Sequence, residues 1–267
     1  MDQNCTMPLG LHKVSLAVIS WNEEKNIARC LASVPWADEI VVVDSESQDQ
    51  TQKIAAAMGA KVVVQPFLGH VAQKQLALSL CQNSWVLSLD ADEVLSPVLF
   101  SKLLPYFEKE KIEVDGFQFH RRSFHLGRWI GYGGWYPDKK LRLVRKEKAH
   151  WSGQDPHDVL LISGRVEPIS ADIQHYVFRD LAHNVAQNNS YSSISAKKLN
   201  EQGVKFSFWM LFLKPPFTFF RLYFFRLGFL DGMAGLIIAV GGAYSQFLKF
   251  AKLWEIQRVK TKKEQGV

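Results

Sequence analysis

Short apolar runs alternate with segments of helical periodicity over the first hundred residues. The runs at residues 14–20, 39–43, 61–64 and 85–89 are rich in Val, Ile and Leu, which predicts buried strands. Between them, residues 23–34, 51–58 and 71–81 carry apolar positions at helical spacing, and Gly59 is placed to end the second helix. This alternation predicts an α/β fold with a parallel sheet, helices on both faces and ligands at the carboxyl ends of the strands.

The pattern changes after about residue 115. Residues 116–124, 131–135 and 140–144 form short aromatic strands and glycine-rich turns, and loops rich in His, Asp and Pro continue to about residue 173. A polar helical stretch at 180–205 then precedes residues 206–229, where 11 of 24 residues are aromatic. We therefore expect an α/β domain that continues into a helical, aromatic extension.

The composition is that of a folded intracellular chain. Apolar residues make up 47% and charged residues 22% of the 267, which excludes disordered, collagen-like and disulfide-scaffold classes. The three cysteines lack any C-x-x-C spacing, so neither a disulfide framework nor a zinc knuckle is expected. The first apolar run is too short for the core of a signal peptide, so we do not expect export by that route.

The positive charge is concentrated in the tail. The net charge is +6, and residues 205–267 hold ten Lys and Arg against three acidic residues. A basic tail on a near-neutral body predicts an anionic membrane surface as partner, not nucleic acid. Residues 206–229 are interrupted by Lys214, Arg221, Arg226 and a Pro-Pro pair, and the 17 uncharged residues at 232–248 fall short of the roughly 20 that span a bilayer.

The aromatic tail is thus predicted to lie in the membrane interface. The alternative is a helical hairpin that packs on the core or in the interface of a homo-oligomer.

Acidic clusters follow three of the predicted strands. Asp90 and Asp92 suit Mg²⁺ or Mn²⁺, which leave coordination positions open for phosphate oxygens, although Asp92 or Glu93 could equally cap the next helix. Asp44 could accept from a base N–H or a ribose hydroxyl. Neither a G-x-G-x-x-G nor a P-loop motif occurs, which argues against a dinucleotide oxidoreductase and a P-loop NTPase.

These clusters resemble, in order and combination, the family 2 glycosyltransferases. The segments that carry the likeness are VISWNEE at 18–24, VDSESQDQT at 43–51, QK at 73–74 and LDADE at 89–93. The family's usual glycines are Glu46 and Gln50 in this chain. The resemblance implies a Rossmann-like GT-A fold that binds a nucleotide-diphosphate sugar, with Asp92 near the metal and the nucleotide and its phosphates held by Asn22, Glu23, Asp44, Lys74 and Asp90.

Later segments are similar to a bacterial branch that contains the lipopolysaccharide inner-core β-1,4-glucosyltransferases. They are GGWYPD at 133–138, LRL at 141–143, PHD at 156–158, QHY at 174–176 and GFLDG at 228–232. The branch commonly has His-Glu where this chain has His157-Asp158. The likeness implies UDP-glucose as donor and a lipid-linked saccharide as acceptor.

Inverting glycosyl transfer needs a base for the acceptor hydroxyl, and Asp158 is our candidate. His157 and His175 could complete the metal shell, although an ordinary loop histidine explains each as well. Arg142 could approach the diphosphate or be a surface arginine. Trp135 could stack on a sugar and Asp138 bind acceptor hydroxyls, or the two could only support a turn.

The sequence therefore predicts an inverting, metal-dependent hexosyltransferase, peripheral on the cytoplasmic face of the inner membrane, acting on a lipopolysaccharide core. Its expected parts are a tail at 1–13, a nucleotide-sugar-binding half at 14–110, an acceptor-side half at 111–204 and a membrane-associating helical region at 205–267. A polyprenyl phosphate acceptor, a protein acceptor and a catalytically silent sugar-nucleotide or membrane-binding module remain as alternatives.

Overall fold

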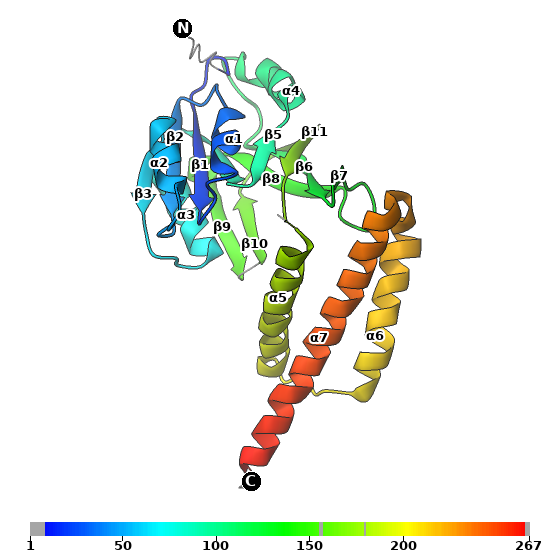
Figure 1. The fold of residues 1–267 in the computed structure, drawn as a ribbon. Coiled ribbons are helices and arrows are strands. Elements are labelled where there is room, and N and C mark those ends of the chain that lie inside the picture. The colour runs from blue at the N-terminus through cyan, green and yellow to red at the C-terminus, as the bar shows by residue number, and fades with distance from the viewer. Residues whose placement is uncertain (1–8, 155–156, 179, 265–267) are drawn as a thin grey trace. The chain divides into compact units, whose positions relative to one another are not determined.

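The computed structural model describes residues 9–154, 157–178 and 180–264, and these form two compact units. Unit 1 takes the described parts of 1–122 and 138–175, and unit 2 those of 123–137 and 176–267. Figure 1 labels the elements of both units.

Unit 1 is built on a mixed sheet whose strand order is β3-β2-β1-β4-β8-β6-β11-β5. The first four of these strands run parallel, and β8 joins β4 antiparallel. A hairpin of β9 and β10 forms a second sheet. The strand bounds are β1 Val14–Ser20, β2 Glu39–Asp44, β3 Lys61–Val64, β4 Trp85–Asp90, β5 Glu93–Leu95, β6 Gly116–His125, β7 Arg128–Trp129, β8 Asp138–Arg145, β9 Ala149–Gln154, β10 His157–Ile162 and β11 Val166–His175.

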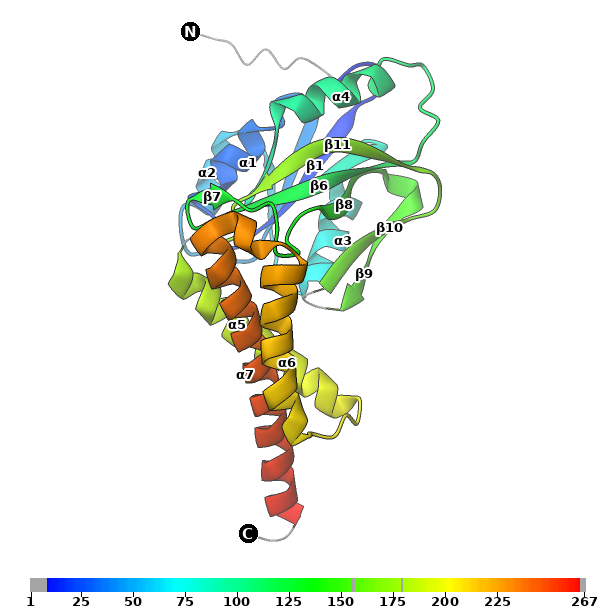
Figure 2. The same cartoon turned by 90° about the vertical axis from the view of Figure 1, so that its right-hand side faces the viewer.

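Helices cover both faces of this sheet, as the alternating pattern predicts. On one face α1, α2 and α4 pack on Leu16, Val18 and Leu87, and on the other α3 and the β9–β10 hairpin pack on Ala17 and Val86. Figure 2 shows the hairpin beside α3. The two sides alternate along each strand because successive side chains point to opposite faces. The helices are α1 Ile27–Ala32, α2 Thr51–Ala57, α3 His70–Leu80 and α4 Pro97–Phe107, with a 3-10 turn η1 at Lys146–Lys148.

The first helix is shorter than the periodicity predicts. It begins at Ile27 instead of residue 23, after a turn in which the carbonyl of Glu23 accepts from the N–H groups of Asn26 and Ile27. The N–H groups of Glu23 and Glu24 donate to Thr51, the first residue of α2, and to Asp49, so side chains of the neighbouring segment hold this turn.

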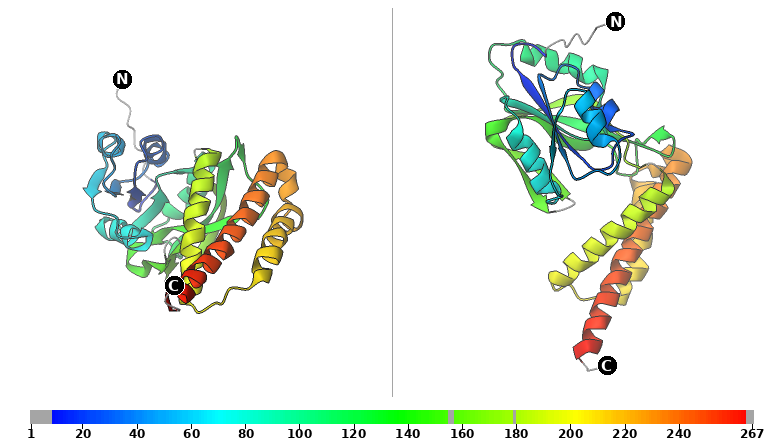
Figure 3. Two further views of the ribbon diagram at one scale, coloured as in Figure 1. Left: turned by 60° about the horizontal axis from the view of Figure 1, so that its bottom comes forward. Right: turned by 60° about the vertical axis from the view of Figure 1, so that its left-hand side comes forward.

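Unit 2 contains three long helices in which α7 lies between α5 and α6 (Figure 3, left). The bounds are α5 Leu181–Glu201, α6 Phe208–Phe220, a π-helical turn η2 at Arg221–Phe225, a 3-10 turn η3 at Gly228–Asp231, and α7 Gly232–Glu264. The expected break at Pro215 and Pro216 does not occur, since α6 continues through both prolines. Helices α6 and α7 form a helical hairpin through η2 and η3. Its close packing needs small residues, because a Cβ on Gly235 would collide with the carbonyl of Gly228.

Of the expected short strands and glycine-rich turns, segment 131–135 is a turn, and it lies in unit 2. Gly133 and Gly134 have φ of +66° and +80°, which curls the chain. The backbone N–H groups of Gly131 and Tyr132 donate to the buried carboxylate of Asp231, the latter at 2.8 Å. Asp231 also pairs with Arg128 at 3.3 Å, so one carboxylate fastens this turn to the helical hairpin.

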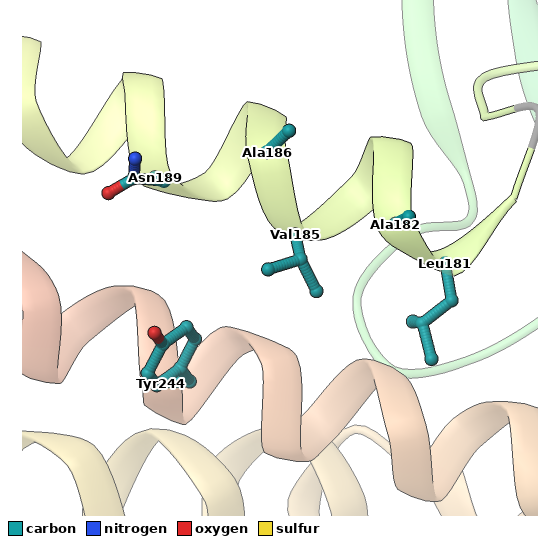
Figure 4. A pocket seen from close by; sticks show the side chains of 6 residues that line it. All are labelled: Leu181, Ala182, Val185, Ala186, Asn189 and Tyr244. Atoms are coloured by element: carbon teal, nitrogen blue, oxygen red, sulfur yellow. The ribbon is translucent and has the colours of Figure 1, made fainter.

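Two apolar features mark the surface of unit 2. An open groove runs between α5 and α7, lined by Leu181, Ala182, Val185, Ala186, Asn189 and Tyr244 (Figure 4). Among the described residues, one helical stretch, Gly228–Val259, is long and apolar enough to cross a membrane by length and composition. A third of its most apolar window is buried.

We predict that Asp231→Ala lowers the free energy of unfolding of unit 2 by about 2–4 kcal/mol. The change removes the buried carboxylate that accepts from the N–H groups of Gly131 and Tyr132, and it leaves Arg128 only the backbone carbonyl of residue 231 as a partner there. Urea unfolding followed by near-UV circular dichroism measures the loss. Glu113→Ala, which removes an exposed carboxylate 3.4 Å from Lys111, is the control and should cost less than about 1 kcal/mol. Equal losses in the two variants would contradict the role of Asp231.

Candidate functional site

Three polar clusters meet at the carboxyl ends of adjacent parallel strands. In the pairing register Ser20 on β1 lies opposite Asp44 on β2, and Ile19 lies opposite Asp90 on β4. Asp44 and Asp90 are the last residues of β2 and β4, and Asn22 and Glu23 lie in the loop that follows β1. The sheet thus brings together residues that are far apart in the sequence.

The loops after β1 and β2 are joined by reciprocal hydrogen bonds. Asn22 donates its N–H to Ser47 Oγ and accepts from the N–H of Gln48, both at 2.8 Å. The half-buried Glu23 accepts from Asn26 Nδ2 at 2.7 Å. Glu46 adopts φ +58°, a left-handed conformation that favours glycine, and it does so at the position where the resembled family usually has glycine.

Asp44 is fully buried at the centre of this arrangement. Its Oδ2 accepts from Ser20 Oγ at 2.7 Å and Ser47 Oγ at 2.6 Å, and its Oδ1 accepts from Ser47 N and Gln52 Nε2. Each carboxylate oxygen already accepts two hydrogen bonds, so a nucleotide would have to replace one of them. In the structure, Asp44 organises the loop that carries the neighbouring polar groups.

Lys74 on α3 lies between two carboxylates that the sequence separates by 68 residues. Its Nζ is 2.7 Å from Asp90 Oδ1 and 2.8 Å from Asp158 Oδ2, and its side chain is 5% exposed. Three predicted site residues thus touch one another. A buried ammonium needs such partners, because desolvation without pairing costs several kcal/mol.

The charges continue in alternation beyond Asp90. Arg142 Nη2 lies 3.0 Å from Asp90 Oδ2 and 2.7 Å from Glu93 Oε1. Glu93 also contacts Arg121, which in turn pairs with Asp138 at 2.8 Å. A chain of ion pairs therefore runs from Asp158 to Asp138, which also lies 3.3 Å from Lys140 Nζ.

Sequence reasoning offered Glu93 only as a possible helix cap and assigned no role to Arg121. Glu93 is completely buried, and it links the two arginines. A signal for Arg121 was present, because the period of two that buries Phe117 and Phe119 on β6 places Arg121 on the same side of that strand.

These pairs shift the pKa values of their members in the direction that keeps them charged. Burial alone would raise the pKa of Asp90, but Lys74 and Arg142 outweigh it and hold that pKa well below its usual range. Burial alone would lower the pKa of Arg142, and Glu93 and Asp90 reverse this so that the pKa rises. The site is therefore a fixed array of opposite charges.

Trp151 on β9 is a further residue that sequence reasoning missed. Its ring centroid lies 4.8 Å from Lys74 Nζ and 5.9 Å from Arg142 Cζ, so it packs against both cations. Among the described residues, Trp151 Nε1 and Arg142 Nε are buried without a hydrogen-bond partner. No spacing signal marked Trp151, since it reaches the site through the β9–β10 hairpin.

The predicted metal ligands are brought together in part. Asp92 Oδ2 lies 3.3 Å from His175 Nε2, close to the roughly 3 Å between neighbouring ligands of an octahedral ion with bonds of about 2.1 Å. The side chain of His157 lies outside the described residues. Within the described part of the chain, no group of three His, Cys, Asp or Glu side chains could hold an ion. Asp92 and His175 fit a cation that takes its other ligands from water and phosphate.

Trp135 belongs to unit 2 and not to the array around Lys74. Its ring stacks on that of His125 at 5.7 Å and packs against Ile130 and Ile238. The geometry thus gives it a place in the small core of unit 2, and its contact with a sugar stays a prediction.

A family model described as "Glycosyl transferase family 2" matches residues 15–161. An uncharacterised glycosyltransferase of Rickettsia typhi is 35% identical over 92% of this chain and 88% of its own length. The lipopolysaccharide core biosynthesis glycosyltransferase LpsC of Rhizobium meliloti is 31% identical over 93% of this chain and 94% of its own. The crystal structure of mannosyl-3-phosphoglycerate synthase from Rubrobacter xylanophilus is 18% identical, with a TM-score of 0.47 over 74% of this chain and 77% of that one.

We predict that Asp90→Asn makes the free energy of unfolding less dependent on pH below about pH 5. The folded-state pKa of Asp90 is depressed, so its contribution is present above the unfolded-state pKa of about 3.9 and is lost as the pH falls toward the folded value. The slope lost is up to about 1.4 kcal/mol per pH unit. Urea unfolding between about pH 3 and 6 measures it, and equal slopes in the variant and the parent would contradict it.

Proposed function

Because the chain belongs to glycosyl transferase family 2, we propose that it is an inverting, metal-dependent hexosyltransferase. The proposed donor is UDP-glucose, and the proposed acceptor is a lipopolysaccharide core at the cytoplasmic face of the inner membrane. The relatives support the class of reaction, and the name of LpsC supports the acceptor. The donor sugar and the inverting course rest on the sequence motifs.

The contact of Lys74 with both Asp90 and Asp158 carries the proposal. Asp90 ends a strand of the nucleotide-binding half, and Asp158 is the candidate base on β10. One side chain joins them through ion pairs of 2.7 and 2.8 Å. A donor diphosphate that approaches Asp90 would therefore lie within reach of the group that deprotonates the acceptor.

Asp158 takes the proton of the acceptor hydroxyl as that oxygen attacks the anomeric carbon. Lys74 holds the carboxylate of Asp158 through Oδ2 and so fixes its direction. Asn22, Glu23 and Asp44 form the nucleotide side of the site. Lys74 and Arg142 place positive charge where the diphosphate leaves, and their ion pairs orient them before the substrate binds.

Asp92 and His175 are the proposed metal ligands, with His157 as a third. A bound Mg²⁺ or Mn²⁺ would neutralise charge on the leaving diphosphate. Asp138 and Trp135 are proposed to contact the acceptor. The partners are thus a nucleotide-sugar, a lipid-linked saccharide and an anionic membrane surface.

The direct test is transfer of labelled glucose from UDP-glucose to a heptose-terminated lipopolysaccharide core in the presence of Mn²⁺. Transfer with inversion at the anomeric carbon supports the proposal. If product forms only on polyprenyl phosphate or only on a protein, that molecule is the acceptor instead of the lipopolysaccharide core. No transfer from UDP-, GDP- or dTDP-sugars by folded protein that binds them favours a catalytically silent module.

We predict that Asp158→Asn lowers kcat by about 10²- to 10⁴-fold, because the amide cannot accept the hydroxyl proton. Donor binding should persist, since the variant keeps the Asp90 and Arg142 contacts. Initial rates and calorimetric titration with UDP separate the two effects. Glu113→Gln serves as the control carboxylate, and an unchanged kcat in Asp158→Asn would rule out this base.

We also predict that UDP-glucose raises the melting temperature more with Mn²⁺ than with EDTA, because a ligand that binds only the folded state stabilises it. Asp92→Asn and His175→Gln should each remove the effect of the metal and keep a smaller shift with the nucleotide. A metal effect that survives both changes would place the ion elsewhere.

A further inference from the structure

Exposed aromatic side chains are concentrated along α6 and η2. Six residues form what we call the aromatic stripe, and each is between 47% and 75% exposed: Trp209, Phe212, Leu213, Phe217, Phe224 and Phe225. Trp209, Leu213 and Phe217 follow one another at steps of four residues and Phe212 lies three residues after Trp209, so these four share one side of α6. Phe224 and Phe225 add exposed rings on η2. Such a continuous apolar surface marks an interaction site.

The opposite side of α6 is already covered. Met210 and Leu211 pack against Phe250 and Leu253 of α7, and the Cβ position of Gly242 meets Leu222. The core of unit 2 therefore uses one face of the α6–η2 segment. The aromatic stripe is what remains outside that core.

Basic residues accompany the stripe without acidic neighbours. Lys214, Arg221 and Arg226 are exposed, and within the described chain no ion pair engages them. Residues 202–230 contain no Asp or Glu. A symmetric contact between two copies would place these cations against their own kind, whereas the phosphates of an anionic bilayer would neutralise them.

Helix α7 is held to a polar helix, which argues against a span. Lys252 Nζ contacts Asn189 Oδ1, Ser192 Oγ and Ser193 Oγ of α5 at 2.7–2.8 Å. Gln257 Nε2 donates to the carbonyl of Val204 at 2.8 Å. An α7 that crossed the hydrocarbon would carry these polar groups and the exposed Lys197 and Lys198 of α5 into it, at a high free-energy cost.

We propose that the aromatic stripe is an in-plane docking surface for an anionic phospholipid bilayer. The rings lie at the level of the acyl boundary, and Lys214, Arg221 and Arg226 reach the phosphates. This proposal adds a docking surface to the membrane-face function proposed above, and it rests on that function to explain why the chain would carry such a surface. The binding itself can be tested without any sugar transfer.

The test is flotation of the full chain with vesicles of phosphatidylglycerol and phosphatidylcholine. We expect Phe212→Ser/Phe217→Ser to lower the vesicle-bound fraction at least tenfold, since two half-exposed rings are removed. The matched control is Phe67→Ser/Leu68→Ser, whose side chains in unit 1 are equally exposed, at 54% and 53% against 55% and 58%. The control should bind as the parent does.

Further measurements test the role of the basic residues and the depth at which the protein lies in the bilayer. Lys214→Gln/Arg221→Gln/Arg226→Gln should weaken binding to phosphatidylglycerol vesicles on the order of a hundredfold and leave the weak binding to pure phosphatidylcholine unchanged. The bound parent should be released by alkaline carbonate, as a peripheral protein is. Brominated lipids should quench the parent more than Trp209→Phe.

Three results would overturn the proposal. They are equal flotation of the stripe and control variants, retention after carbonate extraction, which indicates a spanning helix, and a stable dimer in solution that the stripe variant abolishes. Transfer to a deacylated, water-soluble core separates the two proposals. The stripe variant should keep that activity, while absence of transfer by the parent would overturn the function and leave the vesicle result standing.

Discussion

The burial of a lysine between two carboxylates is the constraint on which the arrangement of unit 1 depends. Lys74 comes from a helix on one face of the sheet, Asp90 from a central strand and Asp158 from a separate hairpin. An almost fully buried ammonium is tolerated only with good partners, so all three elements must hold their positions together. The packing of α3 on the sheet therefore fixes the distance between Asp90 and Asp158 through Lys74.

The parallel half of the sheet could be predicted closely from the sequence, because strands buried on both faces are written as short apolar runs. The acidic residues at their ends were found for the same reason. The ion-pair chain could not be found in this way: Glu93 and Arg121 meet only through the order β8-β6-β11-β5, which no local pattern encodes. Trp151 was missed because its role depends on where a hairpin packs.

Local propensity failed where tertiary contacts supply or remove hydrogen bonds. The start of α1 was predicted four residues early, and the stretch before it is a turn whose N–H groups donate to Thr51 and Asp49. Pro215 and Pro216 do not end α6, whose other face is held by packing against α7. The glycine-rich turn at 131–135 was within the expected strands and turns, but its acceptor, Asp231, lies a hundred positions away and could not be identified locally.

The chain uses its cations in two opposite ways. In unit 1, Lys74 and Arg142 are buried and already neutralised by carboxylates of the same chain, so an anionic ligand gains affinity there only by sharing or replacing those partners. In unit 2, Lys214, Arg221 and Arg226 are exposed beside aromatic rings. In the first arrangement, net charge adds little to the affinity for an anion, and the fixed positions of the cations decide which anion fits. Such a site suits the selection of one substrate. The second arrangement suits the proposed contact with a dense anionic surface, because solvated charges can adapt to phosphates in many positions.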